Sequence, residues 1–322
     1  MTITLQERQE SATREIVLES SRLTARFLPE IGFKFSSLRE KNSGMEFLFQ
    51  PVSGKHPIPT YQGCFVDFDA SGCDEMLPTI DNCLYEGPVF AGRSLPDHGG
   101  VWSRPWSFHV DDQKIHGRIR LLELPLLFEK TISWVDENSL EFRYRVTNES
   151  DSPVDYLWAL HPLCVFQNDA KLLLPRVSEM FNVHQYGQRE EVLPFPVQDS
   201  LGKKAWNVCE LAEYADKKCY KFYPLGPLTG TAGIWYRSQQ MVFLVEFDPK
   251  ETPYLGVWIN RGDPEVQGDY NLAVEPANGF FDSLAVAQRR GTAVSLLPQE
   301  QKSWNVVIRV LDETALDLSQ FA

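Results

Sequence analysis

Apolar and polar residues alternate along many short segments of the chain. In NSLEFRYRVTN (residues 138–148), every second residue from Leu140 to Val146 is apolar, and the residues between them are charged or polar. This period of two is expected of a β-strand with one buried face. Similar runs recur as RLTARFL, GRIRLLEL, LFEKTISW, TAGIWYR, MVFLVEF, YLGVWIN and SWNVVIRVL. Gly, Pro, Asn or Asp separates most of them, which predicts antiparallel strands joined by turns.

A helical pattern is confined mainly to NVCELAEYADKKC (residues 207–219). Asn207 can cap a helix there, and Glu210 stands at the position that completes a capping box. We therefore expect one short helix in this segment. The chain has no strand–helix alternation and no glycine-rich phosphate-binding motif, so no nucleotide cofactor is indicated.

The 322 residues contain no internal repeat, low-complexity tract or flexible linker. We expect residues 1–15 to fray and residues 16–322 to form a single domain. One open sheet of so many strands would curl or split. The prediction is therefore an all-β fold, a large antiparallel β-sandwich with few short helices.

Composition narrows the class of partner. Hydrophobic residues make up 43% of the chain and charged residues 23%, and the formal net charge is −13. The negative charge and the absence of any run of five Lys or Arg argue against nucleic acid as a partner. No segment resembles a secretory signal or a run of 18 apolar residues, so we expect a cytoplasmic protein without a membrane partner.

Metal ions and disulfides are not indicated. The six cysteines are irregularly spaced and form no CxxC pair, so we expect free and mostly buried thiols. The segment DFDASGCDE begins like a calcium-binding loop at Asp67, but position twelve is Pro78 rather than a bidentate Glu. We predict no metal and no organic cofactor.

Three segments combine a titratable residue with neighbours that restrict the backbone: Asp97-His98-Gly99-Gly100, Leu160-His161-Pro162 and Val274-Glu275-Pro276. A histidine at a strand end is often structural. Glu275 follows the apolar run LAV, where burial raises the pKa of a carboxyl toward the range of a general base. The alternative is a glutamate that caps a turn or meets an arginine.

Four segments, in order, make the chain resemble the aldose 1-epimerase family, the galactose mutarotase-like proteins: GCDEMLPTID, LPDHGGVWSRPW, VTNESDSPVDYLWALHPL and LAVEPANGFFDSL. The similarity runs from about residue 20 to about residue 312. It implies a large antiparallel β-sandwich that binds a sugar without a metal or cofactor. It also implies that His98 hydrogen-bonds the substrate, His161 is the general acid and Glu275 is the general base.

The resemblance predicts further sugar contacts. Tryptophan faces stack on pyranose rings, and Trp102, Trp158 and Trp258 are the candidates. Galactose mutarotases carry an arginine upstream of the first histidine, where this chain has Asp74 and Glu75 instead. We count Asp74, Glu75 and Arg104 among the predicted substrate-binding residues. The family's further substrate-binding aspartate corresponds to either Asp248 or Asp263.

The implied reaction is the interconversion of α and β anomers by acid–base ring opening. Hexose-6-phosphate mutarotases carry an arginine where this chain has Trp102, and the nearest arginines are Arg93, Arg104 and Arg261. An unphosphorylated sugar is therefore favoured over a sugar phosphate. A non-catalytic sugar-binding or sensing protein on the same fold is the main alternative. Hydrolysis or lyase action on a glycan is a weaker one.

Overall fold

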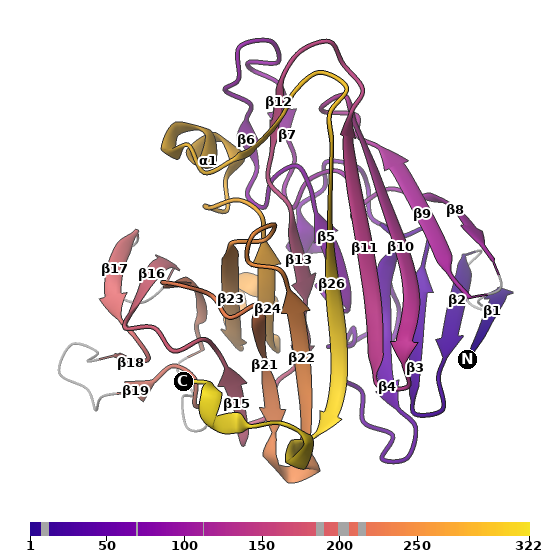
Figure 1. Ribbon diagram of the computed structural model, residues 1–322, viewed down its shortest axis with the longest axis vertical. Helices are drawn as coiled ribbons and strands as arrows, with labels where there is room; N and C mark the ends of the chain where they lie inside the picture. The colour runs from indigo at the N-terminus through magenta and orange to yellow at the C-terminus, as the bar shows by residue number, and fades with distance from the viewer. Residues whose placement is uncertain (8–12, 69, 112, 185–189, 199–205, 212–216) are drawn as a thin grey trace.

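Two large antiparallel sheets dominate the computed structural model, which describes residues 1–7, 13–68, 70–111, 113–184, 190–198, 206–211 and 217–322 (Figure 1). β1 (Thr2–Glu7) lies at one end of the first sheet and β17 (Glu191–Pro194) at the other. The first sheet runs in the order β1 (Thr2–Glu7), β2 (Arg14–Glu19), β3 (Leu23–Leu28), β4 (Lys34–Glu40), β5 (Cys73–Met76), β13 (Ala159–Pro162), β24 (Tyr270–Ala277), β23 (Tyr254–Arg261), β20 (Cys219–Leu225), β16 (Glu179–His184) and β17 (Glu191–Pro194), with β14 (Cys164–Val165) also paired to β24.

The second sheet packs against one face of the first sheet. Its order is β15 (Ala170–Leu173), β21 (Thr231–Tyr236), β22 (Met241–Phe247), β26 (Gln301–Asp312), β11 (Ser139–Asn148), β10 (Leu126–Asp136), β9 (Ile115–Arg120) and β8 (Ser107–Val110). Every segment that the alternation pattern singled out contributes a strand to one of the two sheets. The predicted all-β antiparallel sandwich is confirmed.

Short ribbons and helical turns complete the described part of the chain. The ribbons pair β12 (Val154–Tyr156) with β25 (Val294–Leu296), β18 (Val197–Gln198) with β19 (Trp206–Asn207), and β6 (Cys83–Leu84) with β7 (Ser94–Leu95). The helical elements are α1 (Leu284–Arg290), η1 (Phe65–Asp67), η2 (Arg237–Gln239), η3 (Pro264–Val266), η4 (Glu313–Ala315) and η5 (Leu318–Gln320).

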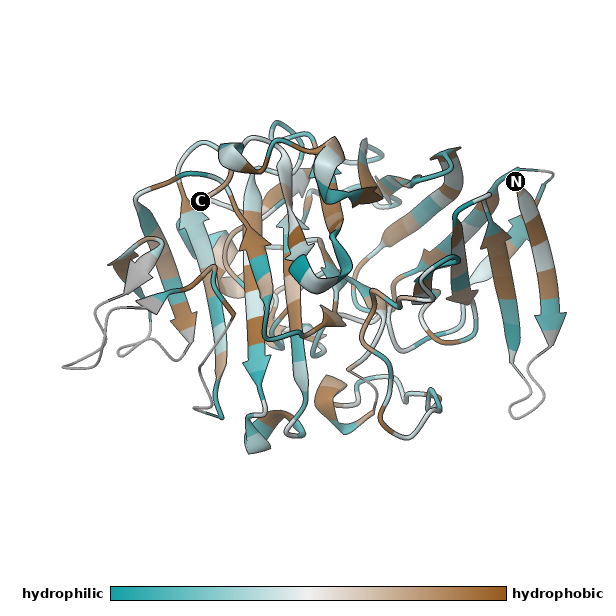
Figure 2. Cartoon of the chain, turned by 90° about the horizontal axis from the view of Figure 1, so that it is seen from below, coloured by the Kyte–Doolittle hydropathy of each residue, from teal (hydrophilic) through white to brown (hydrophobic). Residues whose placement is uncertain are grey.

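The main hydrophobic core lies between the two sheets. Hydrophobic and hydrophilic residues alternate along several strands (Figure 2), so each strand turns one apolar face inward. Phe35 of β4 packs against Phe142 of β11, with ring centroids 5.6 Å apart. Trp158 similarly meets Trp304 of β26 at 4.9 Å. Aromatic contacts of this kind join the sheets face to face.

A charged pair is buried inside this core. Lys130 of β10 lies 3.2 Å from Glu75 of β5, and both side chains are 2% exposed. Tyr144 and Trp158 donate further hydrogen bonds to the two oxygens of Glu75, at 3.0 and 2.9 Å. A buried carboxylate is tolerated only when its oxygens are satisfied in this way. The network ties β5 to the second sheet.

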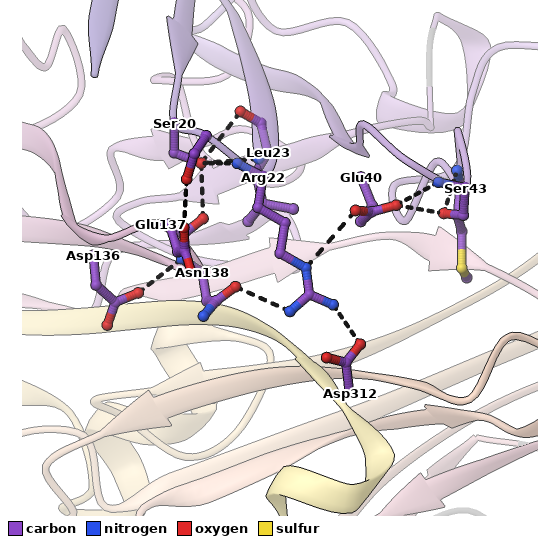
Figure 3. A network of polar contacts seen from close by, with 11 residues as sticks. Ser20, Arg22, Leu23, Glu40, Ser43, Asp136, Glu137, Asn138 and Asp312 are labelled. Atoms are coloured by element: carbon purple, nitrogen blue, oxygen red, sulfur yellow. Dashed lines mark hydrogen bonds and ion pairs between the residues drawn. The ribbon is translucent and has the colours of Figure 1, made fainter.

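A second polar network joins the sheets at one end of the sandwich (Figure 3). Arg22, which lies in the β2–β3 turn, donates to Asn138 at 3.1 Å and to Asp312 at 2.6 Å. The same guanidinium lies 3.8 Å from Glu40 at the end of β4. Ser20 donates to the carbonyl of Glu137, which lies with Asn138 in the turn between β10 and β11, at 2.7 Å. These contacts close one end of the interface.

Thr2–Glu7 pair with Arg14–Glu19 along the sheet edge, and the fraying of residues 1–15 stays a prediction. One sequence prediction about local structure differs from the fold. The helix predicted from Asn207 is wrong where the structure describes the segment. The Asn207 side chain accepts from the amide of Cys209 at 2.9 Å and closes a turn after β19, and residues 212–216 lie outside the described residues.

Because the Lys130–Glu75 pair is buried, we expect the protein to lose much of its stability when one partner is replaced. Replacement of Lys130 by Met leaves the Glu75 carboxylate buried without its counter-charge, which costs about 3–5 kcal/mol of unfolding free energy. Urea denaturation followed by tryptophan fluorescence measures this loss. The double variant Lys130→Met/Glu75→Leu recovers part of it, and Lys114→Met on the surface changes little. A loss below about 1 kcal/mol in the single variant would contradict a structural role for the pair.

Candidate functional site

A cavity of about 410 Å³ lies on the face of the first sheet that is turned away from the second. Leu272 and Val274 of β24 point into the inter-sheet core, so Asn271 and Glu275 of the same strand point into the cavity. The same alternation turns residues of β13, β20 and β23 toward it. Its titratable lining residues are Asp81, Asp97, His98, His161, Glu190, Cys219, Lys221, Asp269, Glu275 and Asp282.

Glu275 and Lys221 form a buried ion pair on the cavity floor. Lys221 Nζ of β20 donates to Glu275 Oε2 of β24 across the intervening strand β23. The residue between them is Gly256, where a Cβ would lie 3.0 Å from Lys221 Nζ and 3.2 Å from Glu275 Oε2. A glycine at this position therefore leaves room for the two side chains to meet.

The pair leaves Glu275 with one oxygen available. Glu275 Oε1 is buried and has no hydrogen-bond partner within the described residues. Burial raises the pKa of Glu275 above its ordinary value, although Lys221 opposes the shift. Burial alone would lower the pKa of Lys221, but the charges of Glu275 and Asp282 raise it, so the lysine stays protonated. Glu275 thus has the properties of a base that accepts through Oε1.

Asp282 supports the same lysine from the loop that follows β24. Its Oδ1 lies 3.9 Å from Lys221 Nζ and accepts a hydrogen bond from the Tyr223 hydroxyl at 2.5 Å. The Asp282 carbonyl accepts from the amides of Ile80 and Asp81, both at 2.9 Å. The loop is therefore anchored to the segment that follows β5, and its carboxylate is held at the cavity wall.

His161 of β13 lies beside Glu275. Its Nε2 is 3.7 Å from Glu275 Oε1, and its Nδ1 is buried without a hydrogen-bond partner among the described residues. Burial lowers the pKa of His161 well below its ordinary value, and the positive charges of His98, Lys221 and Lys34 lower it further. The imidazole of His161 is consequently neutral at physiological pH.

His98 lies in a tight turn that faces His161, with ring centroids 5.6 Å apart. Its backbone is left-handed, with φ of 57°, and Gly99 follows with φ of 73°. A Cβ at Gly99 would lie 1.9 Å from the Leu77 carbonyl oxygen, so only glycine fits there. The His98 ring stacks on Phe65 at 4.0 Å, and its Nδ1 lies 2.8 Å from Asp97 Oδ1.

Backbone hydrogen bonds hold the four motif segments together around the cavity. His98 donates to the carbonyl of Ile80 at 2.6 Å, Leu157 donates to that of Pro78 at 2.9 Å, and Ile80 donates to that of Asp282 at 2.9 Å. The segment after β5 is therefore the common neighbour of the other three. This arrangement brings together residues that lie far apart in the sequence.

Of the residues predicted from the sequence, His98, His161, Glu275 and Trp258 line the cavity. Trp258 is half-buried on β23, and its indole donates to Asn271 Oδ1 at 3.0 Å. The remaining five predicted residues do not line it.

Asp74 and Glu75 form ion pairs outside the lining of the cavity. Neighbouring residues of a strand point to opposite faces, so the two carboxylates cannot face the same ligand. Asp74 accepts from Lys34 Nζ at 2.5 Å, and both side chains are 1% exposed. Glu75 lies in the inter-sheet core with Lys130. Both carboxylates are therefore parts of buried ion pairs and not of the cavity wall.

Trp102, Trp158 and Arg104 also lie away from the cavity. Trp102 is buried and donates to the carbonyl of Asp97 at 2.9 Å, so it supports the His98 turn from behind. Trp158 is fully buried and donates to Glu75. Arg104 donates to the carbonyl of Arg120 at 2.8 Å. None of these three residues is among those that line the cavity.

The residues that the sequence analysis left as alternatives also lie outside the lining of the cavity. Arg93 donates to the carbonyl of Glu123 at 2.9 Å, and Arg261 is fully buried over the Tyr220 ring; neither lines the cavity. Asp263 caps η3 by accepting from the Glu265 amide at 2.9 Å. Asp248 accepts from the amide of Lys250 in a turn.

Sequence reasoning missed Lys221, Asp282 and Phe65. Lys221 interrupts the otherwise apolar strand CYKFYPL, which is the same kind of signal that singled out Glu275 in LAVEP. A charged residue in such a strand needs a partner, but the sequence does not say that the partner lies 54 positions away. Phe65 gave no signal, because its role is to stack on His98.

The described residues contain neither a metal-binding group nor a helix that could span a membrane. No group of three or more His, Cys, Asp or Glu among them is arranged to hold a metal ion. No helix that the structure describes is long and apolar enough to cross a membrane. All six cysteines are free; Cys73, Cys164, Cys209 and Cys219 are buried, Cys83 is half-buried and Cys64 is exposed.

No protein-family model and no curated protein matches the sequence. Solved structures do match the fold. A protein from Synechocystis superposes with a TM-score of 0.71 at 15% identity, over 97% of this chain and 98% of the other. A galactose mutarotase-like protein from Lactobacillus casei gives 0.68 at 14% identity, over 92% and 100%. Another from Clostridium acetobutylicum gives 0.66 at 15% identity, over 97% and 99%.

These similarities extend over nearly the whole of each chain, although only 14–15% of the residues are identical. The chain has the galactose mutarotase-like fold.

Proposed function

We propose that the protein is an isomerase of the aldose 1-epimerase type, which interconverts the α and β anomers of an unphosphorylated sugar. The observation that carries the proposal is the meeting of one carboxylate and two imidazoles, Glu275, His161 and His98, in a single cavity. Anomer exchange needs a base for the anomeric hydroxyl and an acid for the ring oxygen. The site offers both kinds of group.

Ring opening and closure use the same groups in reverse. Glu275 Oε1 takes the proton of the C1 hydroxyl while an imidazole protonates the ring oxygen, and the C1–O5 bond breaks. Rotation about C1–C2 then turns the other face of the aldehyde toward the hydroxyl, and closure returns both protons. Each positioned group contributes about 10²–10⁴-fold to such a reaction. The family resemblance implies that His161 is the acid.

The size and lining of the cavity suit a monosaccharide. A volume of about 410 Å³ lies in the range of small-molecule sites. Trp258 supplies an aromatic face held by Asn271, and pyranose rings stack on such faces. Phe65 and Phe281 add further apolar lining. A small neutral ligand with both polar and apolar faces is the expected occupant.

The charges of the cavity argue against a sugar phosphate. Six carboxylates line it, from Asp81, Asp97, Glu190, Asp269, Glu275 and Asp282. Lys221 is the only lysine or arginine among the described lining residues, and it already pairs with Glu275. A phosphate dianion needs fixed cationic donors such as arginine. An unphosphorylated sugar therefore remains the proposed substrate.

A non-catalytic sugar-binding role is the second candidate. The Lys221–Glu275 ion pair favours it, because a carboxylate that already faces a cation is a weaker base. The free Oε1 of Glu275 favours catalysis instead. Saturable binding of a sugar, seen by tryptophan fluorescence, with mutarotation at the uncatalysed rate would support the second candidate.

Replacement of Glu275 by Gln is expected to abolish the acceleration of mutarotation, with a loss of about 10²–10⁴-fold, because the amide cannot accept the proton. Polarimetry of freshly dissolved α-glucose, α-galactose and a wider panel of sugars measures the rate. Glu141→Gln, on the outer face of the second sheet, is the matched control and keeps full activity. A wild-type protein that accelerates no sugar in the panel would refute the proposal.

Replacement of Lys221 by Met is expected to move the acidic limb of the kcat/KM profile to higher pH. Lys221 opposes the burial that raises the pKa of Glu275, so its removal raises that pKa further. The base form of Glu275 then appears only at higher pH, by about one pH unit or more. Rates measured between pH 4 and 9 test this, with the surface variant Lys250→Met as control. An acidic limb that stays in place would show that Glu275 is not the titrating base.

A further inference from the structure

The strand β1 ends the first sheet, and among the described strands it pairs with β2 alone (Figure 1). Its six residues pair with β2 in continuous register, without a bulge. In an antiparallel ladder, every second residue of an edge strand turns its N–H and C=O groups away from its neighbour. β1 therefore presents a row of backbone donors and acceptors that no described strand uses.

The other strands at the ends of the two sheets are shorter, and two of them are also protected. β8, β15 and β17 have four residues each. β17 ends at Pro194, which cannot donate to a ladder. The outer edge of β15 is covered, because the amide of Leu172 donates to the carbonyl of Cys209 at 2.8 Å. β1 is longer and contains no proline, lysine or arginine, the residues that usually keep an edge strand from pairing with another chain.

The apolar side chains of β1 lie on the same face as the core. Ile3 and Leu5 are the register partners of Leu18 and Ile16, which are fully buried. Directly opposite residues of an antiparallel pair point to the same face. Ile3 is half-buried against the core, whereas Leu5 is 52% exposed. The core therefore has an apolar margin at β1 that remains exposed at Leu5.

The sequence of β1 has the same polarity when it is read in either direction from Thr4. Ile3 and Leu5 on either side are apolar, and Thr2 and Gln6 beyond them are polar. Two copies paired antiparallel about Thr4 place Ile3 of each protomer opposite Leu5 of the other. A slip of one residue would place Leu5 opposite Thr4 and apolar side chains on the wrong face. The strand is thus complementary to a second copy of itself, as a two-fold interface requires.

We propose that two copies of the chain associate through β1, antiparallel about Thr4, so that their first sheets join into one continuous sheet. Leu5 of each protomer then packs beside Ile3 of the other. No residue of β1 lines the cavity, so the inference is independent of the proposed function. A strand paired along both edges is held more firmly than an edge strand, so the fraying predicted for residues 1–15 belongs to the free protomer.

The association is expected to be weak and reversible. A single pair of strands forms a small interface, and interfaces below about 1,200 Å² are typical of transient complexes. Sedimentation equilibrium of the full chain at concentrations up to about 1 mM measures the monomer–dimer equilibrium. Amide hydrogen exchange of Thr2–Glu7 is expected to slow as the protein concentration rises.

Thr4→Lys and Thr4→Glu test the interface, because Thr4 is exposed and faces its own copy on the two-fold axis. Each variant alone places like charges opposite each other, and we expect its dimer dissociation constant to rise about tenfold or more. An equimolar mixture of the two is expected to associate at least as strongly as the wild type. A general effect of net charge would instead shift the two variants in opposite directions. Thr314→Lys, on exposed η4, is the matched control and leaves association unchanged.

Cysteine variants test the register. A Cys64→Ser background removes the exposed thiol. In that background Thr4→Cys places the two Cα atoms about 4.5–5.5 Å apart across the axis, which a disulfide can span. Gln6→Cys separates them by about 13 Å, which is too far for a disulfide. Mild oxidation followed by a non-reducing gel is expected to show a covalent dimer for Thr4→Cys and none for Gln6→Cys.

Three results would overturn the inference. The first is a wild-type chain that stays monomeric up to about 1 mM. The second is a dimer whose dissociation constant neither Thr4→Lys nor Thr4→Glu changes. The third is a disulfide that forms as readily through residue 6 as through residue 4. Each of these results leaves the proposed function standing, because that function is measured by mutarotation and not by association.

Discussion

The buried ion pair of Lys221 and Glu275 is the constraint on which the cavity depends. Its partners belong to strands that are not neighbours, and they meet because β23 carries Gly256 between them. The lysine keeps the carboxylate oriented, and burial keeps its pKa raised. One oxygen is thereby fixed, and the other is buried without a hydrogen-bond partner among the described residues. A base held in this way is preorganised for proton transfer.

The other charges near the site divide into structural and reactive groups. The ion pairs Lys34–Asp74 and Lys130–Glu75 are buried outside the lining of the cavity, and they tie β5 to β4 and to the second sheet. The cavity contains the Glu275 carboxylate, whose Oε1 has no hydrogen-bond partner among the described residues, and the imidazoles of His98 and His161 in different environments. Acid–base catalysis requires titratable groups whose different surroundings give them different protonation states at the same pH.

The sequence predicted the sandwich well because strand periodicity is a local property, as in Ser139–Asn148. It predicted the convergence of His98, His161 and Glu275 only through the family resemblance. The assignment of Asp74 and Glu75 to one ligand conflicted with strand geometry, which separates neighbours. The helix Leu284–Arg290 was missed, although Gly291 and two terminal arginines follow the pattern of a helix end. The partner of Lys221 depends on strand register, which no local pattern encodes.

The most direct test of this account is a crystal structure of the Glu275→Gln variant with a bound monosaccharide. The account predicts a pyranose in the 410 Å³ cavity, with its anomeric hydroxyl within hydrogen-bond distance of residue 275 and its ring oxygen facing an imidazole. It also predicts that the sugar contacts Trp258. A sugar bound elsewhere, or one whose C1 lies beyond the reach of Glu275, would contradict it.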